Sequence, residues 1–162
     1  MSLARDEAGL AVLYTALFLP TVLLLLAFVV ELGGLRVTRA RLVAAADLAA
    51  AAATTEQDVA RLADDGRYHL LPSAASVARQ LLARELEPMA ALLAPGTSAD
   101  AIAASADVEL LEAGVVDRLT GRAYAAPTVR LAFRAPVRAP LLTLAALRDA
   151  VELRIFVVAS AR

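Results

Sequence analysis

Side chains that could do acid–base, nucleophilic or metal chemistry are few in this sequence and are not clustered. His69 is the single histidine, and Asp64 and Asp65 lie nearby in the chain. One imidazole with two adjacent carboxylates has neither the number nor the spacing of ligands that a zinc site requires. The serines lie outside a G-x-S-x-G setting, which argues against a serine hydrolase. We therefore predict that His69 is a loop residue and that the chain has no metal site.

Carboxylate pairs and nucleotide-binding motifs offer no better candidate. Glu85 and Glu87 are two positions apart, so their side chains would point to different faces of a helix. Neither a P-loop nor a G-x-G-x-x-G motif occurs, and the absence of cysteine excludes thiolate ligands, cysteine nucleophiles and disulfides. The formal net charge of −1 gives no basis for nucleic-acid binding. We predict no catalytic residue, no enzyme activity, no cofactor and no nucleic-acid partner.

The most prominent feature is a long apolar segment near the amino terminus. Hydrophobic residues form 60% of the chain, against roughly 45–50% in typical soluble proteins. Residues 10–30 carry no charge, and a bilayer core about 30 Å thick needs roughly 20 helical residues. We predict a transmembrane helix here, kinked at Pro20 because proline removes one backbone donor. A cleaved secretory signal is the alternative, although its apolar core is typically shorter and its start more basic.

Residues 31–63 keep a helical composition and are predicted to extend this helix as a stem. The positions that would form one small or apolar face are Leu35, Leu42, Ala46, Ala49 and Ala53. Such a face suits packing against neighbouring helices, and it equally suits a helix folded back on its own domain. Gly33 and Gly34 mark a point where the helix is free to bend as it leaves the membrane.

Residues 64–162 are predicted to form a head of the α+β class, with a small antiparallel sheet of three or more strands. The expected elements are a helix at 74–87 with Ser73 as its N-cap, a helical turn at 99–104, and strands at 108–116, 128–135 and 151–159. Residues 128–135 alternate in polarity, which is the period of a strand with one buried face. Further expectations are Pro127 and Pro136 as the bounds of that strand, a hairpin connection at 117–121 and an apolar connection of undecided type at 141–147.

Several features of the first third of the chain occur together. They are a charged leader ending in Gly9, an apolar run with Pro20, Glu31 followed by Gly33 and Gly34, and an alanine-rich tract around Asp47 at residues 41–51. Together they resemble the amino terminus of TadE/TadG-like proteins. These are the minor pilin-like components of the Tad (tight adherence, Flp) pilus, a branch of the type IV filament superfamily.

The resemblance implies an arrangement in the cytoplasmic (inner) membrane of a bacterium. Residues 1–9 would be a cytoplasmic leader, 10–30 the single membrane span, 31–63 the stem and 64–162 a pilin-like extracytoplasmic head. Arg36, Arg39 and Arg41 follow the span, so the positive-inside rule taken alone would place the head in the cytoplasm. We follow the resemblance, because members of the family also carry arginines after the span.

The resemblance also marks Gly9 and Leu10 as the place where a prepilin peptidase would cut. Such peptidases favour a Glu five residues after the Gly, and Tyr14 stands there instead. The chain is then either not processed or cut poorly. This departure argues for a minor or accessory component rather than a main shaft subunit.

The function that follows is structural. A minor pilin or pseudopilin-like subunit would take part in the assembly, initiation or capping of a Tad-type pilus, with other pilins and the assembly machinery as partners. Pro20 and Glu31 are candidate helix-packing positions. For Glu31 we favour the alternative that it stands there only because the span ends. The alternative is a membrane-anchored extracytoplasmic binding or secretion-accessory protein that never enters a filament.

Overall fold

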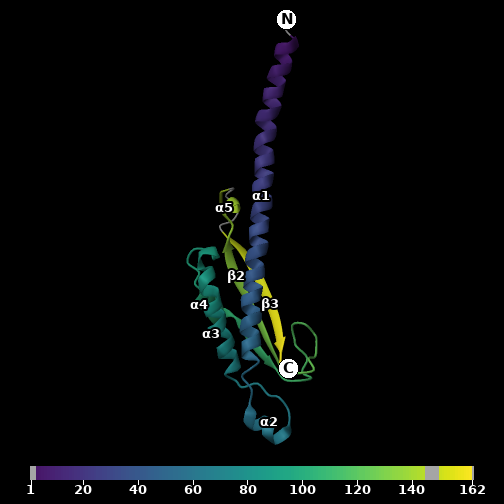
Figure 1. Ribbon diagram of the computed structural model, residues 1–162, viewed down its shortest axis with the longest axis vertical. Coiled ribbons are helices and arrows are strands. Elements are labelled where there is room, and N and C mark those ends of the chain that lie inside the picture. The colour runs from purple at the N-terminus through teal and green to yellow at the C-terminus, as the bar shows by residue number, and fades with distance from the viewer. Residues whose placement is uncertain (1–2, 145–149, 162) are drawn as a thin grey trace.

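A computed structural model describes residues 3–144 and 150–161, and it has one very long helix with a small head built along its carboxy-terminal half (Figure 1). The helices are α1 (Leu3–Ala53), α2 (Val59–Asp65), α3 (Ala74–Leu86), the 3-10 helix η1 (Glu87–Leu92), α4 (Ala99–Ser105) and α5 (Pro140–Leu144). The strands are β1 (Asp107–Leu111), β2 (Thr128–Arg138) and β3 (Ala150–Ser160). These elements confirm the predicted α+β class.

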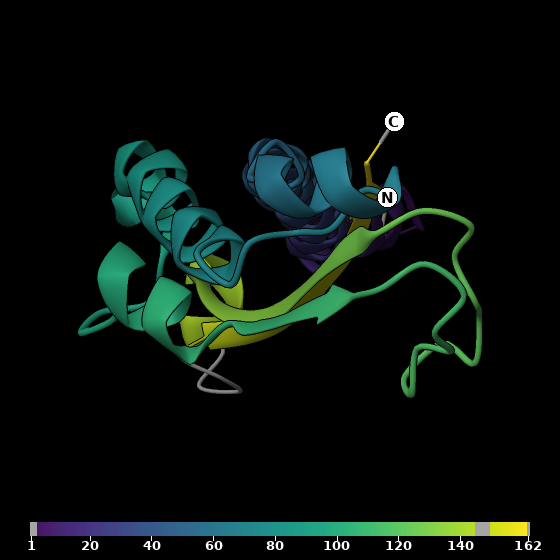
Figure 2. The ribbon, with the colours of Figure 1, turned by 90° about the horizontal axis from the view of Figure 1, so that it is seen from below.

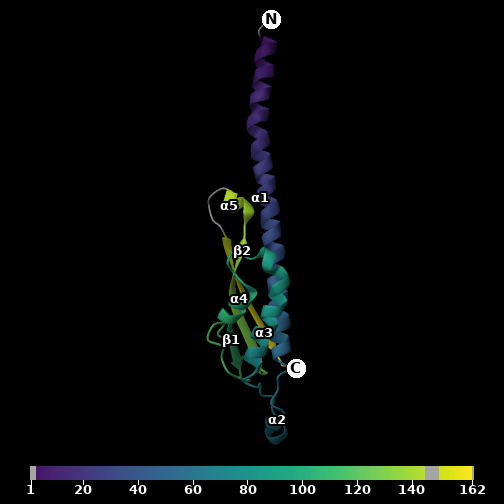
Figure 3. The ribbon, with the colours of Figure 1, turned by 90° about the vertical axis from the view of Figure 1, so that its left-hand side faces the viewer.

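The long helix α1 runs through Pro20 and through Gly33 and Gly34 without interruption. Proline deprives one carbonyl of its usual helical partner, but the helix continues, and the hydroxyl of Thr21 donates to the carbonyl of Leu17 at 2.9 Å in the same turn. Figures 1 and 3 show the result as a single rod that projects far beyond the head. The helix therefore carries most of the apolar segment beyond the head, while its last turns lie beside α5.

The helix ends at Ala53, so the prediction that it continues to residue 63 was wrong. The hydroxyls of Thr54 and Thr55 donate to the carbonyls of Ala51 and Ala52, each at 2.7 Å, as the last turn tightens. Threonine hydroxyls offer such carbonyls an alternative to the next helical N–H. Asp58 then begins the separate helix α2, because its carboxylate accepts the N–H of Arg61 at 3.1 Å.

The second predicted helix is present as α3, but its start differs from the prediction. The backbone of Ser73 is already helical, with φ −62° and ψ −22°, and its side chain makes no capping hydrogen bond. Its hydroxyl instead donates to the carboxylate of Glu56 at 3.4 Å. An N-cap needs an extended backbone to aim its oxygen at the first free N–H groups. The role predicted for Ser73 was therefore wrong.

The three strands form an antiparallel sheet in the order β1-β2-β3. β1 ends at Leu111 rather than near residue 116, and β2 passes through Pro136 to Arg138 instead of stopping before it. The carbonyl of Pro136 accepts the N–H of Ala94 at 2.8 Å, so the backbone polar groups of Pro136 face away from β3. The missing proline N–H is therefore not one that the ladder with β3 uses.

The core lies between the sheet and the helices α1 and α3, which cover the same face of it (Figure 2). Its members from α1 are Leu42, Ala45, Ala46, Ala49, Ala50 and Ala53, and those from α3 are Ala74, Ala78, Leu82 and Leu86. The alanines let two helices and a sheet approach closely, because they add little volume between the backbones. The small-residue face of α1 thus packs on the head of its own chain, which decides between the two readings left open by the sequence.

Candidate functional site

The amino-terminal half of α1 is the surface on which a function for this chain depends. Val12 is 70% exposed and Leu24 is 69% exposed, and the other large apolar side chains between them are exposed as well. The described residues contain one helix long and apolar enough to cross a membrane, and none of its most apolar window is buried inside the chain. Monomeric soluble proteins rarely leave so large an apolar patch uncovered. The exposed segment therefore has the length, composition and exposure expected of a membrane-spanning helix.

Gly9 and Leu10, the residues of the candidate peptidase site, lie in the first turns of α1. Gly9 is exposed, and a side chain added there would meet no atom within 4 Å. The side chain of Leu10 is outside the described part of the molecule. Cleavage at this bond remains a prediction.

Glu31, the acidic residue at the end of the span, has a partner in the head. Its carboxylate accepts the backbone N–H of Leu141 with both oxygens, at 3.2 and 3.0 Å. Leu141 lies in the first turn of α5, where backbone N–H groups have no helical acceptor. The sequence marked Glu31 only as a boundary or a contact with another chain, and it missed this contact across the fold.

The contact closes one end of an apolar groove between α1 and α5. Its lining comprises Leu23, Leu26, Ala27, Val30 and Glu31 from α1, and Pro140 and Leu141 from α5. Within the connection predicted at 141–147, residues 141–144 are helical, and 145–147 lie outside the described residues. The described part of the tip of the β2–β3 hairpin is α5, and this tip thus reaches the part of α1 that is predicted to lie in the membrane.

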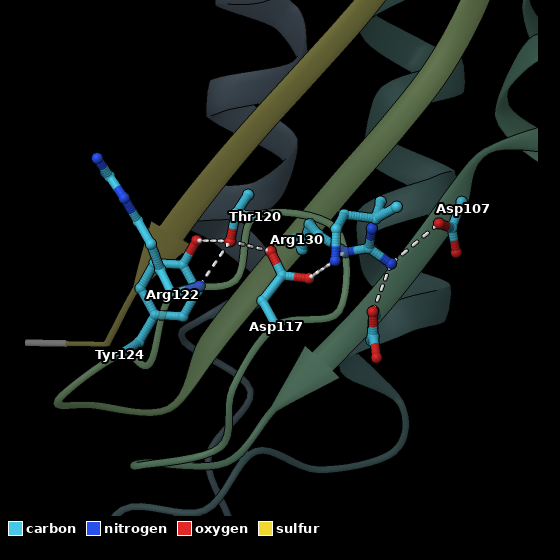
Figure 4. A network of polar contacts seen from close by, with 8 residues as sticks. Asp107, Asp117, Thr120, Arg122, Tyr124 and Arg130 are labelled. Atoms are coloured by element: carbon cyan, nitrogen blue, oxygen red, sulfur yellow. Dashed lines mark hydrogen bonds and ion pairs between the residues drawn. The ribbon is translucent and has the colours of Figure 1, made fainter.

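On the outer face of the sheet, Arg130 of β2 gathers three carboxylates (Figure 4). Its Nη2 donates to Asp107 at 3.0 Å and also to Glu109, both from β1, and its Nε lies 3.7 Å from Asp117. Arg130 is only 4% exposed and Asp117 is fully buried. Removing charge from water is costly unless the charges are paired, so this cluster holds the long β1–β2 loop against the sheet.

Asp117 also organises the turn that carries it. It accepts the hydroxyl of Thr120 at 2.5 Å and the N–H of Leu119 at 3.0 Å. The Thr120 hydrogen bond, followed by the Leu119 N–H and the positive charge of Arg130, lowers the pKa of Asp117 below its ordinary value of 3.8. The predicted turn at 117–121 is present, but it is a turn within the loop rather than a connection between sheet strands.

His69 lies in the loop between α2 and α3 and bridges two carboxylates. Its Nε2 is 2.9 Å from Asp65, and its Nδ1 is 3.1 Å from Glu112 in the β1–β2 loop. The hydrogen bond to Asp65, with a further contribution from Glu112, raises the pKa of His69 above 6.5. The backbone N–H of Arg67 and then His69 lower the pKa of Asp65. The geometry favours a charged bridge that joins two loops at the far end of the head.

No group of three or more metal-ligating side chains in a metal-binding arrangement occurs among the described residues. Arg130 and His69 connect loops to one another and to the sheet, while Glu31 connects the hairpin tip to α1. These polar groups thus hold segments of the head in place. The exposed half of α1, together with α5 beside it, forms an apolar surface that is open to other molecules.

The comparisons with known proteins agree with this reading of the amino-terminal region. Residues 9–65 match the family model described as "Putative Flp pilus-assembly TadE/G-like". No curated protein and no solved structure matches the chain. The matched segment contains the apolar half of α1, the alanine-rich half that packs on the head, and α2. Over these residues the chain is similar to TadE/TadG-like proteins, which the family model connects with Flp pilus assembly.

Proposed function

We propose that this chain is a membrane-anchored minor pilin or pseudopilin-like subunit that takes part in the assembly, initiation or capping of a Tad-type pilus. The observation that carries the proposal is the division of α1 into two halves. One half is buried in the head of its own chain, whereas the other exposes large apolar side chains on every side. An exposed helix of this kind can lie in lipid and can pack against helices of neighbouring subunits.

The mechanism would be assembly by helix packing. In the membrane, the apolar half of α1 is covered by lipid tails, which are as apolar as leucine. Partner helices from other pilins would replace that lipid, while the head sets the spacing of the subunit. The amino terminus would face the cytoplasm and the head would lie outside, with the assembly machinery and a prepilin peptidase as further partners.

A second candidate function is that of an anchored secretion-accessory protein that stays outside the filament. It is favoured by the burial of the alanine face of α1 between Leu42 and Ala53 inside the head. A neighbouring subunit therefore cannot use that face without displacing the chain's own core. Under this second function, the apolar half of α1 would serve only as an anchor.

Oxidative cross-linking of single-cysteine variants separates the two functions, and the chain has no native cysteine to interfere. One cysteine is placed at each position from 11 to 30, and disulfide-linked products are measured in membranes and in sheared surface filaments. Packing against a partner helix predicts cross-links that recur with the 3.6-residue period of a helix. A cysteine at Val59, which is exposed at the opposite end of the molecule, is the matched control.

If cross-linking shows no helical period and the protein is absent from filaments, the pilin role is contradicted. The accessory role then stands. Recovery of the chain in the filament fraction, with periodic cross-links to a second copy or to a pilin that itself carries an introduced cysteine, would support the subunit role.

A further inference from the structure

The hairpin between β2 and β3 brings α5 alongside the apolar half of α1. In Figures 1 and 3, α5 lies above the rest of the head and beside α1 in both views. The groove between the two helices extends along α1 from Glu31 back to Leu23. Leu23 and Leu26 lie well inside the uncharged segment from residue 10 to 30.

This placement has a consequence for depth in a bilayer. An α-helix rises 1.5 Å per residue, so Leu23 lies roughly 10 Å deeper along the axis than Val30. A bilayer that covers residues 10–30 must also cover whatever lies beside residues 23–30. The head therefore does not stop at the membrane surface, because α5 is at the same level as the last two turns of the span.

The composition of the hairpin tip fits a lipid environment. Residues 139–144 carry no charge, and Arg138 precedes them. Pro140 is exposed, while Leu141 and Leu142 are half-buried. An arginine directly before a short apolar segment suits the level of the lipid headgroups, where its charge remains hydrated.

Backbone polar groups decide whether such a tip can enter hydrocarbon, since unpaired groups there cost several kcal/mol each. The N–H of Leu141 is taken by Glu31, and the N–H of Thr143 donates to the carbonyl of Ala139 at 3.0 Å. The proline at position 140 has no N–H to satisfy. These two donors of α5 are therefore already paired, which lowers the cost of placing them in hydrocarbon.

We propose that α5 inserts into the outward-facing leaflet beside α1, so that the protein contacts the membrane with its hairpin tip as well as with its transmembrane helix. The partner is the hydrocarbon layer of the lipid bilayer. The inference rests on α1 as a membrane anchor, not on a role in a pilus. Two contacts with the bilayer instead of one would fix the rotation of the head about the axis of α1.

Tryptophan fluorescence tests this depth, because the chain contains no tryptophan of its own. The full-length protein is reconstituted in phosphatidylcholine vesicles, with or without lipids brominated on their acyl chains, which quench tryptophan in the hydrocarbon layer. Three single-tryptophan variants are compared: Leu142→Trp at the tip, Leu24→Trp within the span and Val59→Trp in α2. We expect strong quenching for Leu142→Trp and Leu24→Trp, and less than a tenth of that quenching for Val59→Trp.

The possible results distinguish insertion of α5 from insertion of α1. Quenching of Leu24→Trp without quenching of Leu142→Trp would overturn tip insertion while leaving the anchor intact. No quenching at either position would overturn both. A Pro140→Trp variant, at an exposed position of the same tip, replaces Leu142→Trp if circular dichroism shows that the latter has lost its fold, and the same two results then decide.

Discussion

The carboxylate of Glu31 accepts the backbone N–H of Leu141 with both oxygens, although 110 positions of sequence separate the two residues. This contact joins the point where α1 leaves the apolar segment to the tip of the β2–β3 hairpin. It gives the acidic residue at the membrane boundary a definite structural role. It also holds α5, the end of the head nearest the apolar segment, against α1.

Replacing Glu31 with Ala should therefore loosen the hairpin tip. Loss of a side chain that caps a helix start costs about 1 kcal/mol, so the amide of Leu141 should exchange with solvent roughly fivefold faster. Amide hydrogen exchange of the full-length protein in micelles measures this directly.

Glu31→Gln keeps an acceptor oxygen and should show a smaller effect, while Arg36→Gln, at an exposed position of the same helix, should leave the exchange of Leu141 unchanged. Equal exchange in Glu31→Ala and the wild type would contradict the role given to this contact.

Arg130 and Arg134 lie four positions apart on the same face of β2 and provide a matched pair for the second prediction. Arg130→Met keeps most of the buried volume but leaves the buried Asp117 without its cation. Breaking a buried ion pair in this way costs about 3–5 kcal/mol. Arg134 is exposed and pairs with Glu152 at 3.3 Å, so Arg134→Met should cost less than about 1 kcal/mol. Urea unfolding of the two variants, followed by circular dichroism, should separate them clearly, and equal losses would show that the Arg130 cluster does not hold the loop.

The bridge of His69 should make the β1–β2 loop sensitive to pH. The pKa of His69 is raised from 6.5, so the stability that the bridge adds is fully present below pH 6.5 and is lost as the pH rises through the folded pKa. The pKa of Asp65 is lowered from 3.8, so its share is present above pH 3.8 and is lost as the pH falls through its folded pKa. The bridge is thus strongest between these limits.

Nuclear magnetic resonance can follow this titration without ambiguity, because His69 is the single histidine. We expect its ring protons to titrate above pH 6.5. Asp65→Asn should lower that midpoint more than Glu112→Gln does, since Asp65 is the larger cause of the shift. A midpoint at or below 6.5 in the wild type would show that the bridge does not form in solution.

The small side chains of α1 within the head support a fourth prediction. Ala49 is fully buried, and Ala44 is exposed on the same helix. Ala49→Leu inserts a larger side chain between α1 and the rest of the head and should destabilise it by about 1–3 kcal/mol. Ala44→Leu adds the same atoms where they meet solvent and should change the free energy of unfolding by less than about 0.5 kcal/mol. If thermal unfolding tolerates both changes equally, the alanine face does not pack on the head as described.

Much of the fold follows from local sequence patterns. The uncharged segment at 10–30 has the length of one membrane span, while the helix beginning at Ala74 and the alternation from Thr128 onward each show the period of their element. The three-stranded antiparallel sheet was therefore predictable, as was the face of α1 that contains Leu42 and Ala49. The errors lie at the ends of elements, at Ala53, Leu111 and Arg138. There, side-chain hydrogen bonds and neighbouring segments decide where a helix or strand stops.

The contacts that position the head were not predictable in the same way. Arg130 follows the polar side of an alternating strand, so its sequence setting suggests an exposed residue. It is buried because the register of β1 against β2 places Glu109 opposite it, and because the β1–β2 loop folds Asp117 over it. The pairing of Glu31 with Leu141 likewise depends on the position of the hairpin tip. A single sequence gives no signal for contacts between such distant segments.

Gly9 provides the last prediction, which concerns processing rather than packing. Tyr14 stands where a prepilin peptidase favours a Glu, so we expect the protein to remain full-length in membranes. A side chain at Gly9 would meet no atom within 4 Å, which makes Gly9→Leu a change that leaves the helix undisturbed. Intact mass spectrometry should then show a difference between the two proteins equal to that of the substitution alone. If the wild type instead begins at Leu10 and Gly9→Leu retains residues 1–9, the bond after Gly9 is cut, and the chain is a processed subunit of the filament rather than an unprocessed accessory.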